Sequence, residues 1–143
     1  MNIRPFCADD LDAIMHIVDV STDDRYTHDF FLGLWEVAPK GFLVADINEV
    51  VVGFILAVLT DIGTLRILMV CVAPKYRKQG IASVLIGAAI HMHEATTIYL
   101  EVKTINKTAI SLYQRHGFEI TEVLFDFYPD GSNAYRMEKK MTE

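Results

Sequence analysis

The stretch PKYRKQGIAS, residues 74–83, concentrates positive charge in a chain whose formal net charge is −6. Its three cations are Lys75, Arg77 and Lys78. An apolar stripe with helical spacing begins at Ile81, so these cations lie where a helix is expected to start. The first N–H groups of a helix lack partners within the helix, and the helix dipole adds positive potential there. Because Gly80 has no side chain, the backbone can approach phosphate oxygens closely. The stretch therefore predicts an anion site, with a solvated turn that carries ordinary surface cations as the alternative.

The segments on both sides of this stretch alternate between strand and helix patterns. Strands are expected over residues 2–6, 41–47, 49–59, 64–74 and 97–103, helices over 8–20, 22–38, 81–93 and 106–117, and a hairpin over 118–141. Asn106 and Gly117 mark the start and the end of the last helix. Because strands lie both before and after the helices, we predict a mixed α+β protein.

The composition suits one domain that spans residues 1–143, because 52% of the residues are hydrophobic and can form one sizeable core. The acidic balance argues against a nucleic-acid partner, since phosphate backbones require a basic face. The first ten residues lack the apolar segment of a signal peptide. The longest nearly unbroken apolar run, Val50 to Leu59, is too short to span a bilayer. We therefore expect a cytoplasmic protein without a nucleic-acid or membrane partner.

Neither the cysteines nor the histidines form a metal-binding pattern. Cys7 and Cys71 are far apart in the chain and are expected to be reduced thiols. The histidines lack carboxylates or cysteines at the spacing of metal ligands, and they are His16, His28, His91, His93 and His116. No metal is expected.

Three blocks of the sequence resemble the GCN5-related N-acetyltransferase (GNAT) superfamily. RKQGIA, residues 77–82, matches the R/Q-x-x-G-x-G/A signature of that superfamily. LEVKTINKTAISLYQRHGF, residues 100–118, resembles the L-E-V-x-x-x-N-x-x-A-x-x-L-Y-x-x-x-G-F run of the branch that acetylates ribosomal and other protein N-termini. FYPDGSNAYRM, residues 127–137, resembles the ending of the same branch. Neither the G-x-x-x-x-G-K-[ST] loop nor the G-x-G-x-x-G fingerprint of other phosphate-binding proteins is present.

The resemblance implies a strongly bent, mixed, mostly antiparallel sheet with helices on both faces and a splayed central pair of strands. It also implies acetyl-CoA as the cosubstrate, with the pantetheine in the splay and the pyrophosphate on the amides at the start of the following helix. The residues expected to bind it are Val70, Cys71, Val72, Arg77, Lys78, Gln79, Gly80, Ile81, Ala82, Ser83, Asn106 and Tyr113.

Tyr113 and Glu101 are the predicted catalytic residues. Direct acetyl transfer requires a neutral amine and a proton for the departing CoA thiolate. A phenol is a donor with a reference pKa of about 10, which suits the second task, and the resemblance implies a tyrosine at position 113 as general acid. Glu101 lies on the strand face opposite Leu100 and Val102, and the resemblance implies that it takes the amine proton, directly or through water. From the residues alone, a core tyrosine and an exposed strand glutamate are the alternatives.

The acceptor is expected to be the α-amine of a protein N-terminus. The reference pKa of an α-amine is about 7.7–8.0 and that of lysine about 10.4, so the α-amine is easier to deprotonate by about 3.5 kcal/mol. Lysine side chains, small amines and polyamines stay as alternatives, because the chain departs from the N-terminal branch at positions that concern the peptide. Phe127 stands in place of a tyrosine, and Ser132 and Asn133 stand in place of an acidic pair.

The stretch DDRYTHDFFLGLW, residues 23–35, is expected to form part of the acceptor wall, because the family that the chain resembles uses its early helices in that way. Its acidic residues favour a cationic acceptor, and they are Asp23, Asp24 and Asp29. A non-catalytic acyl-CoA-binding module is the alternative of another class, although such a module has no reason to keep both Glu101 and Tyr113. For the oligomeric state, a monomer and a homodimer are both compatible with the sequence.

Overall fold

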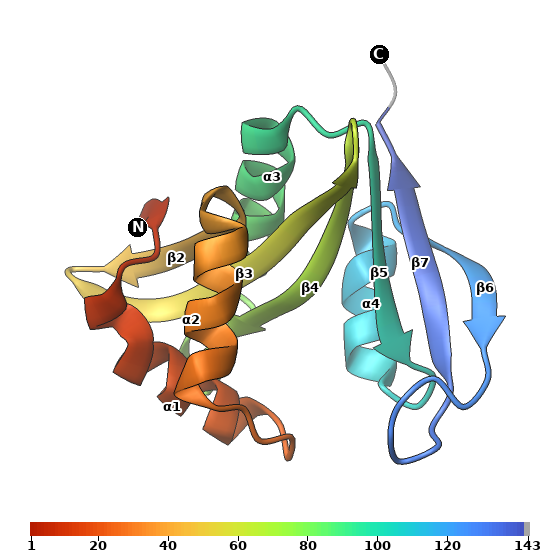
Figure 1. Ribbon diagram of the computed structural model, residues 1–143, viewed down its shortest axis with the longest axis horizontal. Helices are drawn as coiled ribbons and strands as arrows, with labels where there is room; N and C mark the ends of the chain where they lie inside the picture. The colour runs from red at the N-terminus through yellow and green to blue at the C-terminus, as the bar shows by residue number, and fades with distance from the viewer. Residues whose placement is uncertain (142–143) are drawn as a thin grey trace.

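One seven-stranded sheet organises the structure, a computed structural model that describes residues 1–141 (Figure 1). The strands are β1 Asn2–Pro5, β2 Phe42–Ile47, β3 Val50–Asp61, β4 Thr64–Val72, β5 Thr97–Lys103, β6 Glu119–Leu124 and β7 Ala134–Lys140. Their order across the sheet is β1-β2-β3-β4-β5-β7-β6. All neighbours are antiparallel except β4 and β5, which are parallel. The expected mixed, mostly antiparallel sheet is confirmed.

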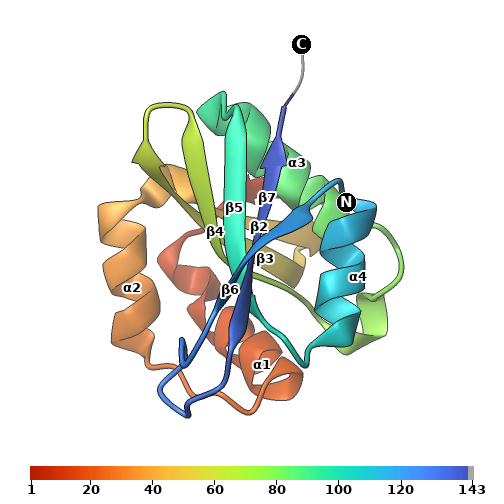
Figure 2. The same cartoon turned by 90° about the vertical axis from the view of Figure 1, so that its right-hand side faces the viewer.

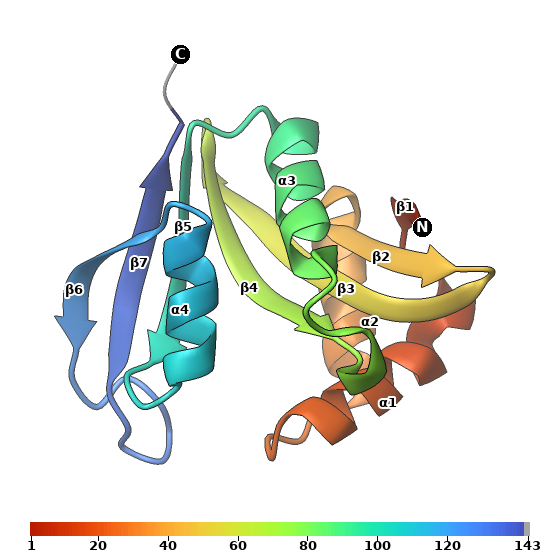
Figure 3. The ribbon, with the colours of Figure 1, turned by 180° about the vertical axis from the view of Figure 1, so that it is seen from behind.

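Four α-helices cover the sheet from both sides, as expected. They are α1 Leu11–Ser21, α2 His28–Val37, α3 Ile81–His93 and α4 Lys107–Arg115. Single turns of 3₁₀ helix occur at Ala8–Asp10, Pro39–Gly41 and Pro74–Tyr76. α1 and α2 lie on one face and α3 and α4 on the other (Figures 1 and 3). Within residues 1–141, no helix is long and apolar enough to cross a membrane.

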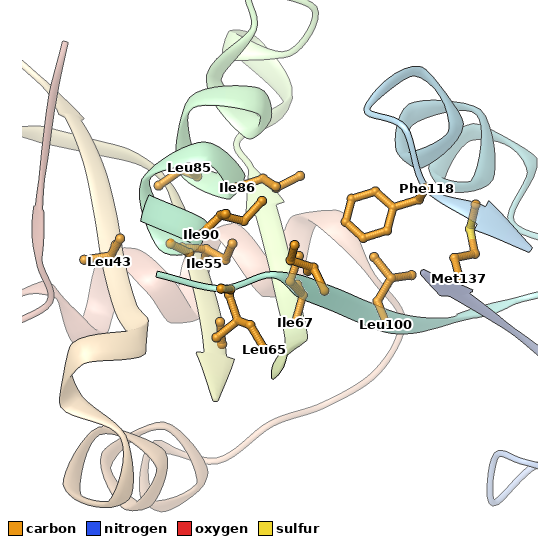
Figure 4. Close-up of a cluster of buried hydrophobic side chains, with 14 of the residues drawn as sticks. Leu43, Ile55, Leu65, Ile67, Leu85, Ile86, Ile90, Leu100, Phe118 and Met137 are labelled. Carbon is orange, nitrogen blue, oxygen red and sulfur yellow. The ribbon is translucent and has the colours of Figure 1, made fainter. Parts of the chain in front are cut away.

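Two apolar cores lie on the two faces of the sheet. The larger one joins the sheet to α3 and α4, and Leu65, Leu85, Leu100, Phe118 and Met137 are among its fully buried members (Figure 4). The smaller one lies under α1 and α2 and is rich in phenylalanine rings, including those of residues 31, 42 and 54. β2 and β3 contribute to both cores, which explains their nearly continuous apolar sequences.

The smaller core stops at β4. Among the described residues, none from β5, β6 or β7 belongs to it. The face of β5 and β7 on the α1–α2 side is therefore available for polar side chains, while α4 packs on the opposite face. Figure 2 shows these three strands edge-on, between α4 on one side and the more distant α2 on the other.

The expected hairpin at the end of the chain is formed by β6 and β7, but its connection is long. The tight turn lies inside this connection, where the Gly131 amide donates to the Tyr128 carbonyl at 2.8 Å. The PDG sequence therefore shapes the tip of a loop instead of joining the two strands directly. This loop brings Tyr128 toward the exposed face of β5.

Candidate active site

The parallel strands β4 and β5 form only a short pairing and then diverge (Figure 1). Their paired residues are Thr64 with Thr97, Leu65 with Ile98, and Arg66 with Tyr99. Beyond Arg66, β4 continues to Val72 with β3 as its only strand partner among the described residues. The side of β4 that faces β5 thus presents unpaired backbone groups, which a ligand with amide groups can bind. Val70, Cys71 and Val72 lie on this part of β4, where the resemblance implied the pantetheine.

The backbone between β4 and α3 is shaped for an anion. Lys78 and Gly80 both adopt left-handed conformations, with φ of 64° and 80°. No side chain caps the N-terminus of α3, and the amides of Lys78, Gln79 and Gly80 donate to no group within residues 1–141. A run of free N–H groups at a helix start binds phosphate. A Cβ on Gly80 would meet nothing within 4 Å, so the glycine is required by its φ angle and leaves open space above the amides.

Arg77 has a different environment from the other cations of this loop. Its Nε donates to the Val72 carbonyl at 3.0 Å, and its Nη2 donates to Ser21 Oγ at 3.0 Å. The side chain thus ties the loop to the end of β4 and to the last residue of α1. Lys75 and Lys78 are exposed and are free to meet a negatively charged ligand.

α4 and α3 border the diverging strands and are joined to each other. The Asn106 side-chain oxygen accepts from the Ala109 amide at 3.2 Å and so caps α4, as its position in the sequence predicted. Ser83 Oγ lies 2.9 Å from Nε2 of His116, which follows α4, and this contact links the two helices. Burial, Lys139 and Arg115 lower the pKa of His116, which favours its neutral form as a partner for the hydroxyl.

Tyr113 projects from α4 into the larger core, where its ring packs edge-on against Phe118 with centroids 5.8 Å apart. Burial raises the pKa of Tyr113, and the neighbouring groups Cys71 and Tyr128 raise it further. The phenol therefore keeps its proton at neutral pH. Cys71 packs against the smaller core, and burial raises its pKa to about 11, so its thiol is neutral and a poor nucleophile.

Glu101 lies on the face of β5 away from the larger core, as expected, but it is not exposed. Its side chain is only 6% accessible and lies between two arginines. Arg66 Nε donates to Glu101 Oε1 at 2.9 Å, and Arg66 Nη2 donates to the same oxygen. Arg136 Nε lies 3.5 Å from Glu101 Oε2, and neither of these two buried atoms has a hydrogen-bond partner within residues 1–141.

Two loops converge on this charged cluster. Burial, Glu101, Tyr26 and Asp24 together raise the pKa of Tyr128 to about 12, against an opposing effect of Arg66. Tyr128 belongs to the β6–β7 loop, whereas Tyr26 and Asp24 belong to the connection between α1 and α2. These two loops therefore flank the exposed face of β5, on the side of the sheet opposite α3 and α4.

The site thus has two compartments that meet where β4 and β5 diverge. One offers amides, lysines and unpaired strand backbone, and the other offers tyrosines and a charged cluster. Such a sheet, with a phosphate cradle on one side and an open polar face on the other, defines a transferase that takes an acyl group from CoA.

The comparison with known families agrees with this class. Residues 9–118 match the model of the Acetyltransferase (GNAT) family, and the chain belongs to this family. It is an acetyl-CoA-dependent N-acetyltransferase, as the sequence predicted. Within residues 1–141, no group of three or more histidine, cysteine, aspartate or glutamate side chains is arranged to hold a metal ion.

Individual relatives extend the match over nearly the whole chain. An N-alpha-acetyltransferase of Sulfurisphaera tokodaii is 31% identical over 90% of this chain and 86% of its own length. An uncharacterized N-acetyltransferase of Methanocaldococcus jannaschii is 33% identical over 98% and 92%. The crystal structure of Ard1 from Thermoplasma volcanium has a TM-score of 0.93 and 33% identity and covers 99% of this chain and 98% of that one. Arabidopsis thaliana Naa50, in complex with the bisubstrate analogue CoA-Ac-MVNAL, has a TM-score of 0.83 and 26% identity, with 98% of each chain covered.

Sequence reasoning missed the two arginines around Glu101. Arg66 alternates with the buried Leu65 and Ile67, and Arg136 precedes the buried Met137, so both were identifiable as residues of the polar face. Their convergence on one carboxylate depends on the register of β4 with β5 and of β5 with β7, where Glu101 pairs with Arg136. No local pattern in the sequence gives that register.

Proposed function

We propose that this protein transfers the acetyl group of acetyl-CoA directly to the α-amine of a protein N-terminus. The observation that carries the proposal is that the α1–α2 loop, with Tyr26, and the β6–β7 loop, with Tyr128, both lie at the end of the molecule where β4 and β5 diverge (Figure 1). Lys103 of β5 lies 5.2 Å from the Tyr128 ring. A free chain end can enter between two such loops with its first amine directed toward the diverging strands. The relative of Sulfurisphaera tokodaii is named an N-alpha-acetyltransferase, which supports the same acceptor.

Acetyl-CoA supplies the acetyl group as an activated thioester. We propose that the amides of residues 78–83, together with Lys75 and Lys78, bind its pyrophosphate, and that Val70–Val72 and Asn106 contact the pantetheine. In this arrangement Arg77 fixes the loop through Nε and Nη2, which donate to Val72 and Ser21, and its Nη1 is left to meet the phosphates.

Tyr113 and Glu101 are proposed to handle the two protons of the reaction. The acceptor nitrogen attacks the thioester carbon, the carbon–sulfur bond breaks, and the Tyr113 hydroxyl gives its proton to the sulfur. Glu101 Oε1 is occupied by Arg66, so Oε2 is the oxygen with a lone pair free for the amine proton, directly or through one water. The neutral Cys71 thiol favours direct transfer over an acetyl-cysteine route.

The acceptor class is tested by initial rates with acetyl-CoA and three acceptors of matched concentration. They are a peptide with a free α-amine and no lysine, the same peptide with a blocked N-terminus and one lysine, and a polyamine. We expect the first to have a kcat/KM at least about tenfold higher, because its amine is easier to deprotonate. Faster turnover of the lysine peptide or the polyamine overturns the α-amine assignment.

We also propose that residues 1–143 act as one acetyltransferase domain in the cytoplasm, although residues 142 and 143 lie outside the described part of the chain. One sheet includes strands from Asn2 to Lys140. Both cysteines are free, which suits a reducing compartment.

A further inference from the structure

The tip of the β6–β7 loop, residues 128–132, has a shape that its own hydrogen bonds fix. The Gly131 amide donates to the Tyr128 carbonyl at 2.8 Å, and the Tyr128 amide donates to the Ser132 carbonyl at 3.2 Å. Asp130 Oδ1 accepts from the Ser132 amide at 2.9 Å and from the Ser132 hydroxyl at 2.6 Å. The tip is therefore one small hydrogen-bonded unit, and its place in the molecule depends on how this unit is attached to the sheet.

Two residues at the end of β5 attach the loop. The Thr104 amide donates to the Asn133 carbonyl at 3.1 Å, which fixes the base of the loop beside the start of β7. Lys103 Nζ donates to Asp130 Oδ2 at 3.2 Å and lies over the Tyr128 ring, 5.2 Å from its centroid. One ammonium group thus contacts the tip twice, by an ion pair and by a cation–π interaction. Figure 1 shows the loop beside the end of β5 at which β4 and β5 diverge.

Apolar packing contributes little to this attachment. Within residues 1–141, no residue of the loop 125–133 belongs to either apolar core. Phe125 and Phe127 are exposed, and Tyr128 is only partly buried. Because a loop with few buried contacts has low local stability, polar contacts decide where it lies. Lys103 is therefore well placed to control the position of Tyr128.

The charges on this face of the sheet leave Asp130 as the carboxylate that pairs with Lys103. Glu101 precedes Lys103 by two residues on the same face of β5. However, Glu101 Oε1 accepts from Arg66, and Arg136 lies 3.5 Å from Glu101 Oε2. Glu101 is thus already matched by two guanidinium groups, and the ammonium of Lys103 is directed to the loop.

We propose that Lys103 is a positioning residue for the acceptor, because it holds the tip of the β6–β7 loop against β5 and so fixes Tyr128 at the wall of the acceptor compartment. The inference rests on the proposed function in that the acceptor is a peptide that enters between the two loops. If the wall is in place for only part of the time, the apparent affinity for the acceptor falls in proportion to that fraction. The chemical step, which we assign to Tyr113 and Glu101, does not depend on the tip once the acceptor is bound.

The inference also gives a role to the two neutral residues that stand in place of an acidic pair. The Ser132 amide and hydroxyl orient Asp130, whose other oxygen accepts from Lys103. Asn133 Oδ1 accepts from the Asp126 amide at 2.9 Å, at a residue whose φ of 53° is left-handed. These neutral side chains therefore shape the loop around a single carboxylate, and Lys103 binds that carboxylate.

The first test is a split between KM and kcat in steady-state kinetics with acetyl-CoA and a peptide that has a free α-amine. For Lys103→Met we expect the KM of the peptide to rise about three- to tenfold, because two weak contacts are lost, while kcat and the KM of acetyl-CoA stay within about twofold. Lys103→Arg should restore most of the peptide KM, since a guanidinium can keep both contacts. Lys140→Met is the matched control, because Lys140 lies at the opposite end of the β5–β7 pairing, and it should leave all three constants unchanged. An unchanged peptide KM in Lys103→Met overturns the inference.

A second measurement needs no turnover and separates the inference from the proposed function. Binding of the peptide to the CoA-loaded protein is measured by calorimetry for the wild type, Lys103→Met, Asp130→Asn and the double variant. We expect each single change to weaken binding and the double change to weaken it by less than the product of the two, because both remove the same ion pair. This result supports the positioning role even if no α-amine is acetylated. If a lysine peptide is the acceptor, the α-amine assignment fails and both comparisons are made with that peptide. Equal binding by the wild type and Lys103→Met, or independent effects of the two changes, overturns the positioning role and leaves the proposed function intact.

Discussion

Tyr113 combines two properties that a general acid for a departing thiolate requires. Its hydroxyl belongs to a ring fixed against Phe118, and its pKa is raised above the ordinary value of 10.0 by burial. A raised pKa means that the neutral, proton-bearing form persists through the whole neutral and mildly alkaline range. The raised pKa also makes the phenol a weaker acid, so protonation of the thiolate depends on the position of the hydroxyl beside the sulfur.

Tyr113→Phe is therefore expected to lower kcat by about 10²–10⁴-fold while keeping the affinity for acetyl-CoA. The ring stays, so the free energy of unfolding should change by about 1 kcal/mol at most. Steady-state kinetics and calorimetry check the two parts. In the wild type, ionisation of Tyr113 should cause no loss of kcat between about pH 8 and 9.5, because its pKa lies above 10.0. A Tyr113→Phe variant with wild-type turnover contradicts the acid role.

Glu101→Gln is expected to lower kcat most at low pH, where more of the acceptor amine is protonated and a base is needed most. The change also removes the negative partner of Arg66, so we expect a loss of about 1 to 3 kcal/mol in the free energy of unfolding. The pH profile of kcat and a denaturant titration measure these effects separately. A loss of stability without any change in the pH profile would show that Glu101 is a structural ion-pair partner only.

The sequence predicted on which face Tyr113 and Glu101 lie, because helical spacing and strand alternation fix the face of a side chain. The alternative of an exposed strand glutamate is wrong, because the Glu101 side chain is 6% accessible and pairs with Arg66. Its pairing with Arg66 depends on a contact between residues 35 positions apart. Likewise, the charge of Arg77 suggested a phosphate ligand, whereas its guanidinium contacts Val72 and Ser21.

At the scale of elements, the loop before α3 is the part on which the proposed binding of the pyrophosphate depends. Left-handed conformations at Lys78 and Gly80 turn successive amides toward one side, and α3 adds its free N–H groups. Arg77 stabilises this shape of the loop through its hydrogen bonds to Val72 and Ser21. The anion site is therefore preformed in the protein without the ligand.

Gly80→Trp is expected to weaken acetyl-CoA binding by at least about tenfold, because the indole takes the space above the amides. Gly80→Ala is the matched control. Both variants bear the same backbone strain at φ 80°, about 1 to 2 kcal/mol, but the alanine Cβ meets nothing within 4 Å. Calorimetry with acetyl-CoA distinguishes them, and equal affinity in the two variants contradicts the cradle.

The elements themselves were predictable, since each expected helix and strand is present, but the helix expected over 22–38 begins only at His28, where the Thr27 side chain caps it. Their hydrophobic periods and their terminators, such as Gly117 and Asn106, are local signals. No local pattern in the sequence predicts the short pairing of β4 with β5. The expectation that these central strands diverge came only from the family resemblance. The long β6–β7 connection was likewise missed, because PDG predicts a turn but not its distance from the strands.

At the scale of the whole molecule, the two halves of the sheet share only a short strand pairing, and the larger core is their main connection. Three residue pairs connect β4 to β5, and beyond them the ion pair of Arg66 with Glu101 and the contact of Ser83 with His116 bridge the halves. A cosubstrate that binds where the strands diverge contacts both halves at once. Its binding energy therefore adds to the cohesion of the sheet, whereas a ligand on one half alone would not have this effect.

Acetyl-CoA at 100 times its Kd is expected to stabilise the protein by about 2.7 kcal/mol, which corresponds to a rise in Tm of roughly 5 to 10 °C. In a hydrogen-exchange experiment, the added protection should be confined to the amides that contact the ligand. We expect the amides of residues 67–72 and 78–83 to exchange more slowly, because they gain partners from the ligand. Strands β2 and β3, whose amides are already paired, serve as the internal control. Protection that is spread evenly over the sheet, or that is absent from residues 67–72, contradicts binding between the diverging strands, since a ligand elsewhere would not supply partners to the unpaired side of β4.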